Sequence, residues 1–188
     1  KVIDAQGMWV TPGFIDLHVH GGGGLEVMDG SYEAICTMAK VHSRGGTTAF
    51  LPSTSTASHD EFIRAIDAAL QGMEEGTGGA EVLGINLEGP YINPKKKGAQ
   101  RTEDVRLPDI REFEEFWKAS KGTIKLITVA PELEGALDFI KAVKSKGVRI
   151  AAGHSEVTYE GAINSFEAGI SHVTHTFNGM SGLHHRDP

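Results

Sequence analysis

The stretch Gly13-Phe-Ile-Asp-Leu-His-Val-His-Gly-Gly-Gly-Gly24 decides the fold class of this sequence. Its apolar first half predicts a strand, which ends in His18 and His20 directly before a run of glycines. A dinucleotide-binding sheet would carry a GxGxxG turn between its first strand and its first helix, and this strand is not followed by one. In (β/α)8 barrels, polar functional residues collect at the C-terminal ends of the strands. The stretch therefore favours a barrel over an open, doubly wound sheet.

The rest of the sequence alternates short β-branched runs with helical stretches, which is the pattern of a parallel sheet built from βα units. We expect strands at Gly13–His20, Thr47–Thr54, Glu81–Glu88, Lys125–Ala130, Arg149–His154 and Ser171–Phe177. We expect helices at Tyr32–Arg44, Asp60–Glu75, Pro108–Ser120, Gly135–Lys146 and Tyr159–Ala168. The predicted fold class is α/β, a partial (β/α)8 TIM barrel with about six strands and five helices.

Composition limits the classes of partner. The chain has 188 residues and a net charge of -7, which argues against a nucleic acid or an anionic membrane as its main partner. No apolar run approaches the ~20 residues that span a bilayer. The single cysteine, Cys36, excludes an internal disulfide framework and fits a reducing compartment. We therefore expect a cytoplasmic protein that acts on a small molecule.

The two ends predict that the sequence is a piece of a longer protein. Lys1 is not an initiator residue, and Lys1-Val-Ile-Asp-Ala5 is typical of the end of a strand. The last residues, His185-Arg-Asp-Pro188, predict a loop rather than a terminal helix.

Histidine and glutamate residues recur at the predicted strand ends. His18 and His20 lie two positions apart on one strand, so their side chains point to the same face. Glu88 ends the third strand, His154 the fifth and His175 the sixth. Imidazole and carboxylate ligands together suit Zn²⁺ or Fe²⁺ with open positions for water. His172, three positions before His175, should face the other side of the sheet and play a structural role.

Several motifs carry a resemblance to a known family. Val10-Thr-Pro-Gly-Phe-Ile-Asp-Leu-His-Val-His-Gly21 resembles the first barrel strand of the amidohydrolase superfamily. Within that superfamily the chain is most similar to the N-acetylglucosamine-6-phosphate deacetylase family, through Leu87-Glu-Gly-Pro-Tyr91, Lys97-Gly-Ala-Gln100, Ala152-Gly-His-Ser155 and Thr174-His-Thr-Phe-Asn-Gly-Met180.

The resemblance implies a role for each matching residue. Glu88, His154 and His175 would bind the principal metal, and His18 and His20 would help to hold a second metal that only some members possess. Gln100 would lie near the substrate. Three further residues would contact the phosphate, namely Asn178, Gly179 and Arg186. In this family the arginine can reach the neighbouring subunit's site, and so we expect a homodimer.

The implied reaction is metal-assisted hydrolysis of the acetamide of N-acetylglucosamine 6-phosphate, which gives glucosamine 6-phosphate and acetate. The resemblance places the general base, an aspartate, beyond Pro188, so the catalytic residue is unknown in this chain and the chain alone should be inactive. It also implies that residues 1–9 end a small N-terminal β-domain and that residues 10–188 form a barrel that is incomplete at its C-terminus.

Two alternatives remain open. One is another amidohydrolase that acts on a cyclic amide or an N-acyl amino acid; many of these use a carboxylated lysine on the fourth strand, and Lys125-Leu-Ile-Thr-Val-Ala130 has no lysine at its C-terminal end. The other is a truncated chain that binds a metal or a ligand without catalysis.

Overall fold

The structure, a computed structural model, describes residues 2–186. Lys1, Asp187 and Pro188, which fall within the predicted domain bounds, lie outside the described residues. No strand forms among residues 2–13, where a final β-domain strand was predicted. The side chains of Val2 and Ile3 are exposed there, and a strand needs a partner that these residues do not contact.

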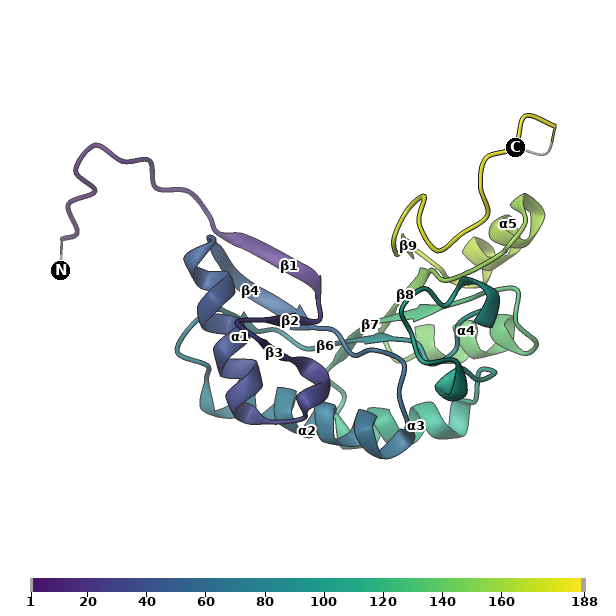
Figure 1. Cartoon of the computed structure of the whole chain (residues 1–188), viewed down its shortest axis with the longest axis horizontal. Helices are drawn as coiled ribbons and strands as arrows, with labels where there is room; N and C mark the ends of the chain where they lie inside the picture. Colours follow the sequence, from purple (N-terminus) through teal and green to yellow (C-terminus); the bar gives the residue numbers. More distant parts are fainter. Residues whose placement is uncertain (1, 187–188) are drawn as a thin grey trace.

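Parallel strands form an open, curved row (Figure 1). The first sheet has the order β1 (Phe14–Val19), β4 (Thr47–Pro52) and β5 (Glu81–Val82), and the second has the order β6 (Ile85–Glu88), β7 (Ile124–Val129), β8 (Arg149–Ala152) and β9 (His172–Val173). Among residues 2–186, one isolated parallel bridge, Ser53 to Asn86, joins the two sheets. Because β5 and β6 together occupy the position of one predicted strand, six of the eight positions of a (β/α)8 barrel are filled, which confirms the predicted partial barrel.

The predicted third strand is broken at Gly84, and this break separates β5 from β6. Gly84 has φ 154, and a Cβ atom there would lie 2.6 Å from the carbonyl oxygen of Thr123 and 2.4 Å from Cγ of Lys125. Only glycine fits such a close approach. The break is therefore set by close contact with residues 123–125 at the start of β7, which periodicity does not reveal.

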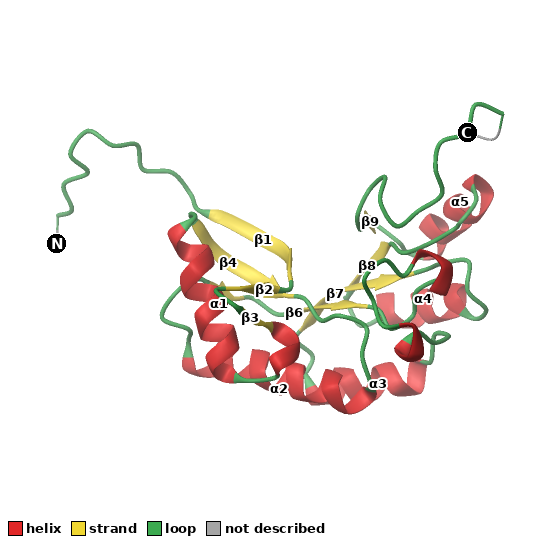
Figure 2. Cartoon of the chain, in the orientation of Figure 1, coloured by secondary structure: helices red, strands yellow, loops and turns green. Residues whose placement is uncertain are grey.

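The α-helices of residues 2–186 lie along the outer side of the strands (Figure 2). They are α1 (Tyr32–Arg44), α2 (His59–Glu75), α3 (Ile110–Ala119), α4 (Ala136–Lys144) and α5 (Tyr159–Ala168), within a few residues of the predicted ranges. A capping box begins α2, where the Glu61 carboxylate accepts hydrogen bonds from the Ser58 amide at 2.9 Å and hydroxyl at 2.6 Å. Phe62, Phe113, Phe116 and Phe139 fill the core between helices and strands.

The connections that follow the strands carry the remaining elements. A hairpin of β2 (Gly21–Gly22) and β3 (Leu25–Glu26) follows β1 and leads into η1 (Val27–Asp29), and η2 (Pro94–Lys96) and η3 (Thr102–Asp104) follow β6. Within residues 2–186, no helix has the length and the apolar composition that a membrane crossing requires.

Candidate metal centre

Glu88 lies at the centre of the predicted cluster, at the end of β6, and its side chain is only 1% exposed. Its Oε1 atom lies 3.3 Å from Nε2 of His18, 3.2 Å from Nε2 of His154 and 2.7 Å from Nε2 of His175. Its Oε2 atom lies 3.0 Å from Nε2 of His20. The five residues predicted as metal ligands therefore converge, although they come from four different strand ends.

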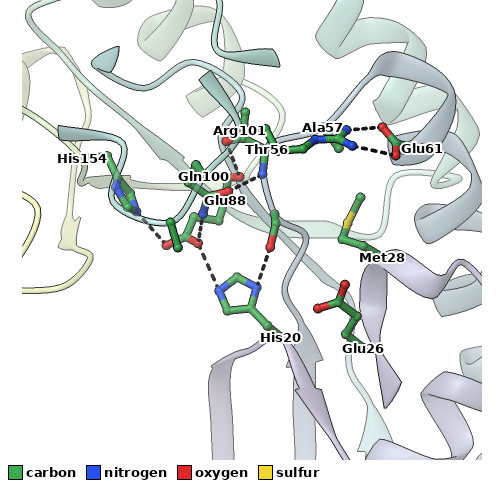
Figure 3. A pocket seen from close by; sticks show the side chains of 12 residues that line it. His20, Glu26, Met28, Thr56, Ala57, Glu61, Glu88, Gln100, Arg101 and His154 are labelled. Atoms are coloured by element: carbon green, nitrogen blue, oxygen red, sulfur yellow. Dashed lines mark hydrogen bonds and ion pairs between the residues drawn. The ribbon is translucent and has the colours of Figure 1, made fainter. Parts of the chain in front are cut away.

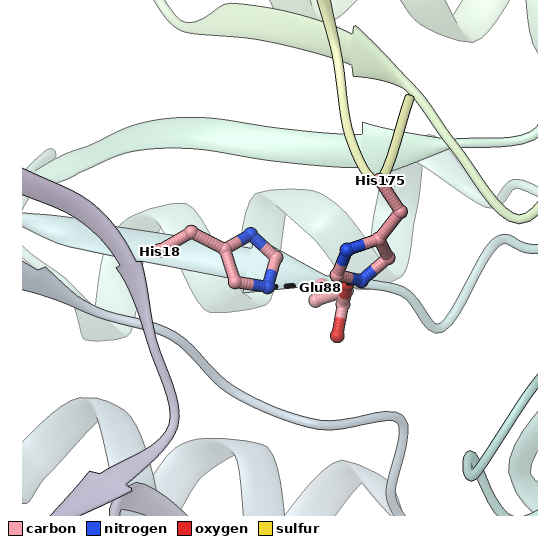
Figure 4. A group of neighbouring side chains, drawn as sticks. All are labelled: His18, Glu88 and His175. Carbon is pink, nitrogen blue, oxygen red and sulfur yellow. Dashed lines mark hydrogen bonds and ion pairs between the residues drawn. The ribbon is translucent and has the colours of Figure 1, made fainter. Parts of the chain in front are cut away.

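Figure 4 shows three of them, His18, Glu88 and His175, pointing toward one another from separate segments. Each of the three offers a ligand atom within 4.8 Å of the others, which is close enough for one ion to bind all three. His172 is exposed, and its Nδ1 atom lies 2.9 Å from the Ser171 hydroxyl rather than in the cluster. The structure thus separates His172 from the centre, as predicted.

Left-handed backbone places two of the histidines. β8 ends at Ala152, two residues before His154, and β9 ends at Val173, two residues before His175. His154 has φ 51 and His175 has φ 53. This conformation costs a residue with a side chain about 1–2 kcal/mol, and it turns each ring back toward Glu88.

The Nδ1 atoms of two histidines are held by backbone carbonyls. Nδ1 of His154 lies 2.8 Å from the carbonyl oxygen of Lys96, and Nδ1 of His20 lies 3.0 Å from that of Ser53. A carbonyl oxygen only accepts hydrogen bonds, so each Nδ1 carries the proton. In a neutral ring, Nε2 then carries no proton and presents a lone pair. The Nε2 lone pairs of His20 and His154 both face the Glu88 carboxylate.

This arrangement fits a bound cation. A lone pair and a carboxylate oxygen that face each other at about 3 Å repel, unless a proton or a metal ion lies between them. Metal-binding histidines commonly donate their second ring N–H to a carbonyl in this way. Nitrogen and oxygen donors of this kind suit a divalent transition metal.

Without a metal, protons satisfy the same contacts. Burial would raise the pKa of Glu88, but hydrogen bonds from His154, His18 and His20 outweigh it and hold this pKa well below its usual range. The hydrogen bond to Glu88 raises the pKa of His20 above its ordinary value, against the effect of burial. For His154, burial lowers the pKa, and the bonds to Glu88 and Lys96 more than compensate and raise it.

Gln100 joins the cluster by a direct bond. Its Nε2 donates to Oε2 of Glu88 at 2.8 Å, and its Oε1 accepts from the Thr56 amide at 2.7 Å. Beside these residues lies a pocket of about 430 Å³ (Figure 3). Its lining includes His20, Glu26, Glu88, Gln100, Arg101 and His154. A small polar molecule can thus approach the cluster from this side.

The predicted phosphate residues differ in their positions. A Cβ atom at Gly179 would lie 3.5 Å from Nδ1 of His154, so Gly179 borders the cluster. Asn178 is exposed, and its amide donates to the His175 carbonyl at 2.6 Å. Arg186 is exposed on the C-terminal segment, where its amide donates to Nδ1 of His184 at 3.3 Å. Asn178 and Gly179 thus lie next to the predicted ligands His175 and His154, whereas the bond of Arg186 is with His184.

Sequence reasoning missed Asn86, which is fully buried beneath the cluster. Its Nδ2 donates to the Ser53 hydroxyl at 2.9 Å and lies 3.4 Å from Nδ1 of His18. Asn86 is two positions before Glu88 on β6, so strand alternation alone could have placed it on the same face. The carbonyl of Lys96 was also missed, and backbone groups of this kind leave no signal in a sequence.

Comparisons with known proteins identify the family of the chain. The sequence profile of the Amidohydrolase family matches residues 9–188. The chain is 40% identical to an N-acetylgalactosamine-6-phosphate deacetylase of Escherichia coli O157:H7, and the match covers 100% of this chain and 50% of the relative. It is 37% identical to an N-acetylglucosamine-6-phosphate deacetylase of Bacillus subtilis, with 95% of this chain and 46% of the relative covered.

Solved structures give the same result. A mutant N-acetyl-D-glucosamine-6-phosphate deacetylase from Mycobacterium smegmatis, in complex with N-acetyl-D-glucosamine-6-phosphate, superposes with a TM-score of 0.88 at 33% identity. That match covers 94% of this chain and 45% of the solved one. The chain thus spans about half the length of the relatives that it matches.

Proposed function

Because the chain belongs to the amidohydrolase family, we propose that the complete protein containing it is a deacetylase of N-acetylglucosamine 6-phosphate. It would hydrolyse the acetamide to give glucosamine 6-phosphate and acetate. The observation that carries this proposal is the convergence of four histidines on one buried carboxylate beside an open pocket. The relatives named above support the choice of substrate.

The proposed cofactor is zinc or iron, as one or two ions. Glu88, His154 and His175 would hold the principal ion, and His18 and His20 would hold a second one. What such an ion supplies is Lewis acidity, which activates water and polarises the acetyl carbonyl. Gln100 fixes the rotation of the Glu88 carboxylate through its bond to Oε2, and it would also lie near the substrate at the edge of the pocket.

We further propose that Asn178, the Gly179 amide and Arg186 bind the phosphate. Arginine suits this role because its planar guanidinium forms charge-assisted, bidentate bonds with phosphate oxygens. The general base stays a predicted aspartate beyond Pro188. In this proposal residues 1–9 end an N-terminal β-domain, residues 10–188 belong to the barrel, and the protein is a homodimer.

A cytoplasmic location is part of the same proposal. It rests on the single cysteine, Cys36, which is buried and free. A small phosphorylated amino sugar is the proposed partner, and the net charge of -7 argues against a nucleic acid.

N-acetylgalactosamine 6-phosphate is a second candidate substrate, because the 40% identical relative is named for it. The two sugars differ only in the configuration at C4, whereas the acetamide that would be hydrolysed is attached at C2 in both. Amidohydrolases that use a carboxylated lysine are a weaker alternative. Lys125 lies near the start of β7, and that strand ends at Val129.

The test is an acetate-release assay on the complete protein with both sugar phosphates, paired with elemental analysis. We expect a bound transition metal and a higher kcat/KM for one of the two sugars than for an N-acyl amino acid or a cyclic amide. Metal binding with no acetate release from either sugar would overturn the proposed function and favour another amide or a non-catalytic role.

A further inference from the structure

Glu132 is a carboxylate near the C-terminal end of a barrel strand that has no role in the proposed reaction. It lies in Val129-Ala-Pro-Glu132, just beyond the end of β7. Its Oε1 accepts hydrogen bonds from Nδ2 of Asn93 at 2.8 Å and from the Glu156 amide at 2.6 Å, and its Oε2 accepts from the Ser155 hydroxyl at 2.6 Å. Both oxygens are therefore turned toward the loops after β6 and β8. Glu132 is also absent from the lining of the pocket.

One branch of this network leads to the ring of His154. The backbone N–H of Asn93 donates to the His154 carbonyl at 2.9 Å. The side-chain Oδ1 of Asn93 accepts from the backbone N–H of Lys95 at 2.9 Å and so caps the start of η2. Lys96, the last residue of η2, provides the carbonyl that accepts from Nδ1 of His154 at 2.8 Å. The bond from Asn93 to Glu132 therefore fixes the short helix that orients the ring.

The other branch leads to the backbone of His154. Glu132 binds the Ser155 hydroxyl and the Glu156 amide, which directly follow His154. The Ser155 hydroxyl also accepts from the Val157 amide at 3.0 Å, and the Ser155 amide donates to the Gly179 carbonyl at 3.0 Å. These bonds hold the segment that begins at the left-handed His154, where φ is 51. A strained conformation of this kind persists only where its surroundings fix it.

We propose that Glu132 is a positioning residue for His154. Its carboxylate binds Asn93, which begins the short helix whose Lys96 carbonyl accepts from the His154 ring, and it also binds the two residues that follow His154. The inference rests on the proposed metal role of His154. Hydrogen bonds to a charged acceptor are stronger than neutral ones, so a single carboxylate can hold three donors from two loops. Changes to such supporting residues typically lower metal affinity about 10–100-fold.

The experiment compares three variants of the complete protein with the unsubstituted form. Glu132→Ala removes the network. Glu132→Gln keeps one carbonyl oxygen for the Asn93 and Glu156 donors, and it should retain most of the function. Glu134→Ala is the matched control, since Glu134 is exposed on the same loop and makes none of the hydrogen bonds or ion pairs found among residues 2–186. A core variant, Val143→Ala in α4, controls for a loss of stability alone.

Two measurements decide the result. Zinc titration of the metal-free proteins should give an affinity about 10–100-fold lower for Glu132→Ala than for Glu134→Ala, with Glu132→Gln between them. Amide hydrogen exchange of the metal-free proteins should be faster at residues 93–96 and 154–157 in Glu132→Ala only. Val143→Ala should lower the Tm and leave the zinc affinity unchanged.

Equal zinc affinities for Glu132→Ala and Glu134→Ala would overturn the inference, even if hydrogen exchange changed, because Glu132 would then stabilise only the loop. A zinc affinity of Val143→Ala as low as that of Glu132→Ala would overturn it too. Absence of zinc or iron binding by the unsubstituted protein would instead overturn the proposed function.

Discussion

Nε2 of His175 lies 2.7 Å from Oε1 of Glu88, although the two residues are 87 positions apart in the chain. The contact joins the ends of β6 and β9, which are separated in the sheet by β7 and β8. Such proximity depends on the curvature of the sheet, because strand ends in a flat sheet would be spaced about 4.8 Å per strand. Curvature brings the two side chains to one point, where a single ion can bind both.

Glu88→Gln in the complete protein should remove metal and deacetylase activity together. Glutamine keeps the size of the side chain but removes the anion that faces four histidines. We expect the metal affinity to fall at least about 100-fold, more than for a supporting residue. Glu81→Gln on β5 is the control, because Glu81 is exposed. Full metal content in Glu88→Gln, measured by elemental analysis, would contradict the assignment of this residue.

Metal-free protein should lose stability as the pH rises above 6.5. The pKa values of folded His20 and His154 are raised above 6.5, so their stabilising contribution is fully present below 6.5 and is lost as the pH rises through the folded values. With zinc bound the sign should reverse, because protons compete with the metal for the rings.

Thermal unfolding between about pH 6 and pH 8, with and without zinc, tests this pair of trends. His172→Ala should keep both trends, because His172 lies outside the cluster. Glu88→Gln should weaken both. A metal-free Tm that increased over this range in the unsubstituted protein would refute the expected sign.

Arg186→Ala should reduce turnover of the phosphorylated sugar far more than turnover of unphosphorylated N-acetylglucosamine. The lost charge-assisted bond is worth about 1.5–3 kcal/mol, which corresponds to roughly a 10- to 100-fold loss in kcat/KM. Arg44→Ala, on the last turn of α1, is the control for a general loss of positive charge. Equal losses with the two substrates would remove Arg186 from the phosphate site.

Phe113→Ala should lower the free energy of unfolding by about 3–5 kcal/mol, since it leaves a cavity in the core. Phe113 is fully buried, and its ring centroid lies 5.7 Å from that of Phe139. Leu137→Ala, at a residue that is 38% exposed, should cost less than about 1 kcal/mol. Denaturant unfolding of the complete protein measures both, and similar costs for the two would show that Phe113 does not lie in the main core.

Strand alternation and the common rim of a barrel predicted the convergence of His18, His20 and Glu88, because these residues lie on or directly after regular strands. His154 and His175 were placed at the same rim, but their left-handed backbone was not predicted. That conformation depends on contacts from other loops, such as those of Glu132 and Gly179. Local sequence does not record contacts of this kind, and the same reason explains the missed break at Gly84.

The bridge between the two sheets, from Ser53 to Asn86, lies directly beneath the cluster. His18 and His20 come from the three-stranded sheet and its edge, whereas Glu88, His154 and His175 follow strands of the four-stranded sheet. Glu88 faces histidines of both groups, so metal bound to the cluster would link the two sheets and would bind fully only after both had formed. Removal of the metal by a chelator should therefore loosen the contact between the two sheets before it loosens either sheet. Amide hydrogen exchange should increase most at the Thr54 amide, which donates to the Asn86 carbonyl at 3.0 Å.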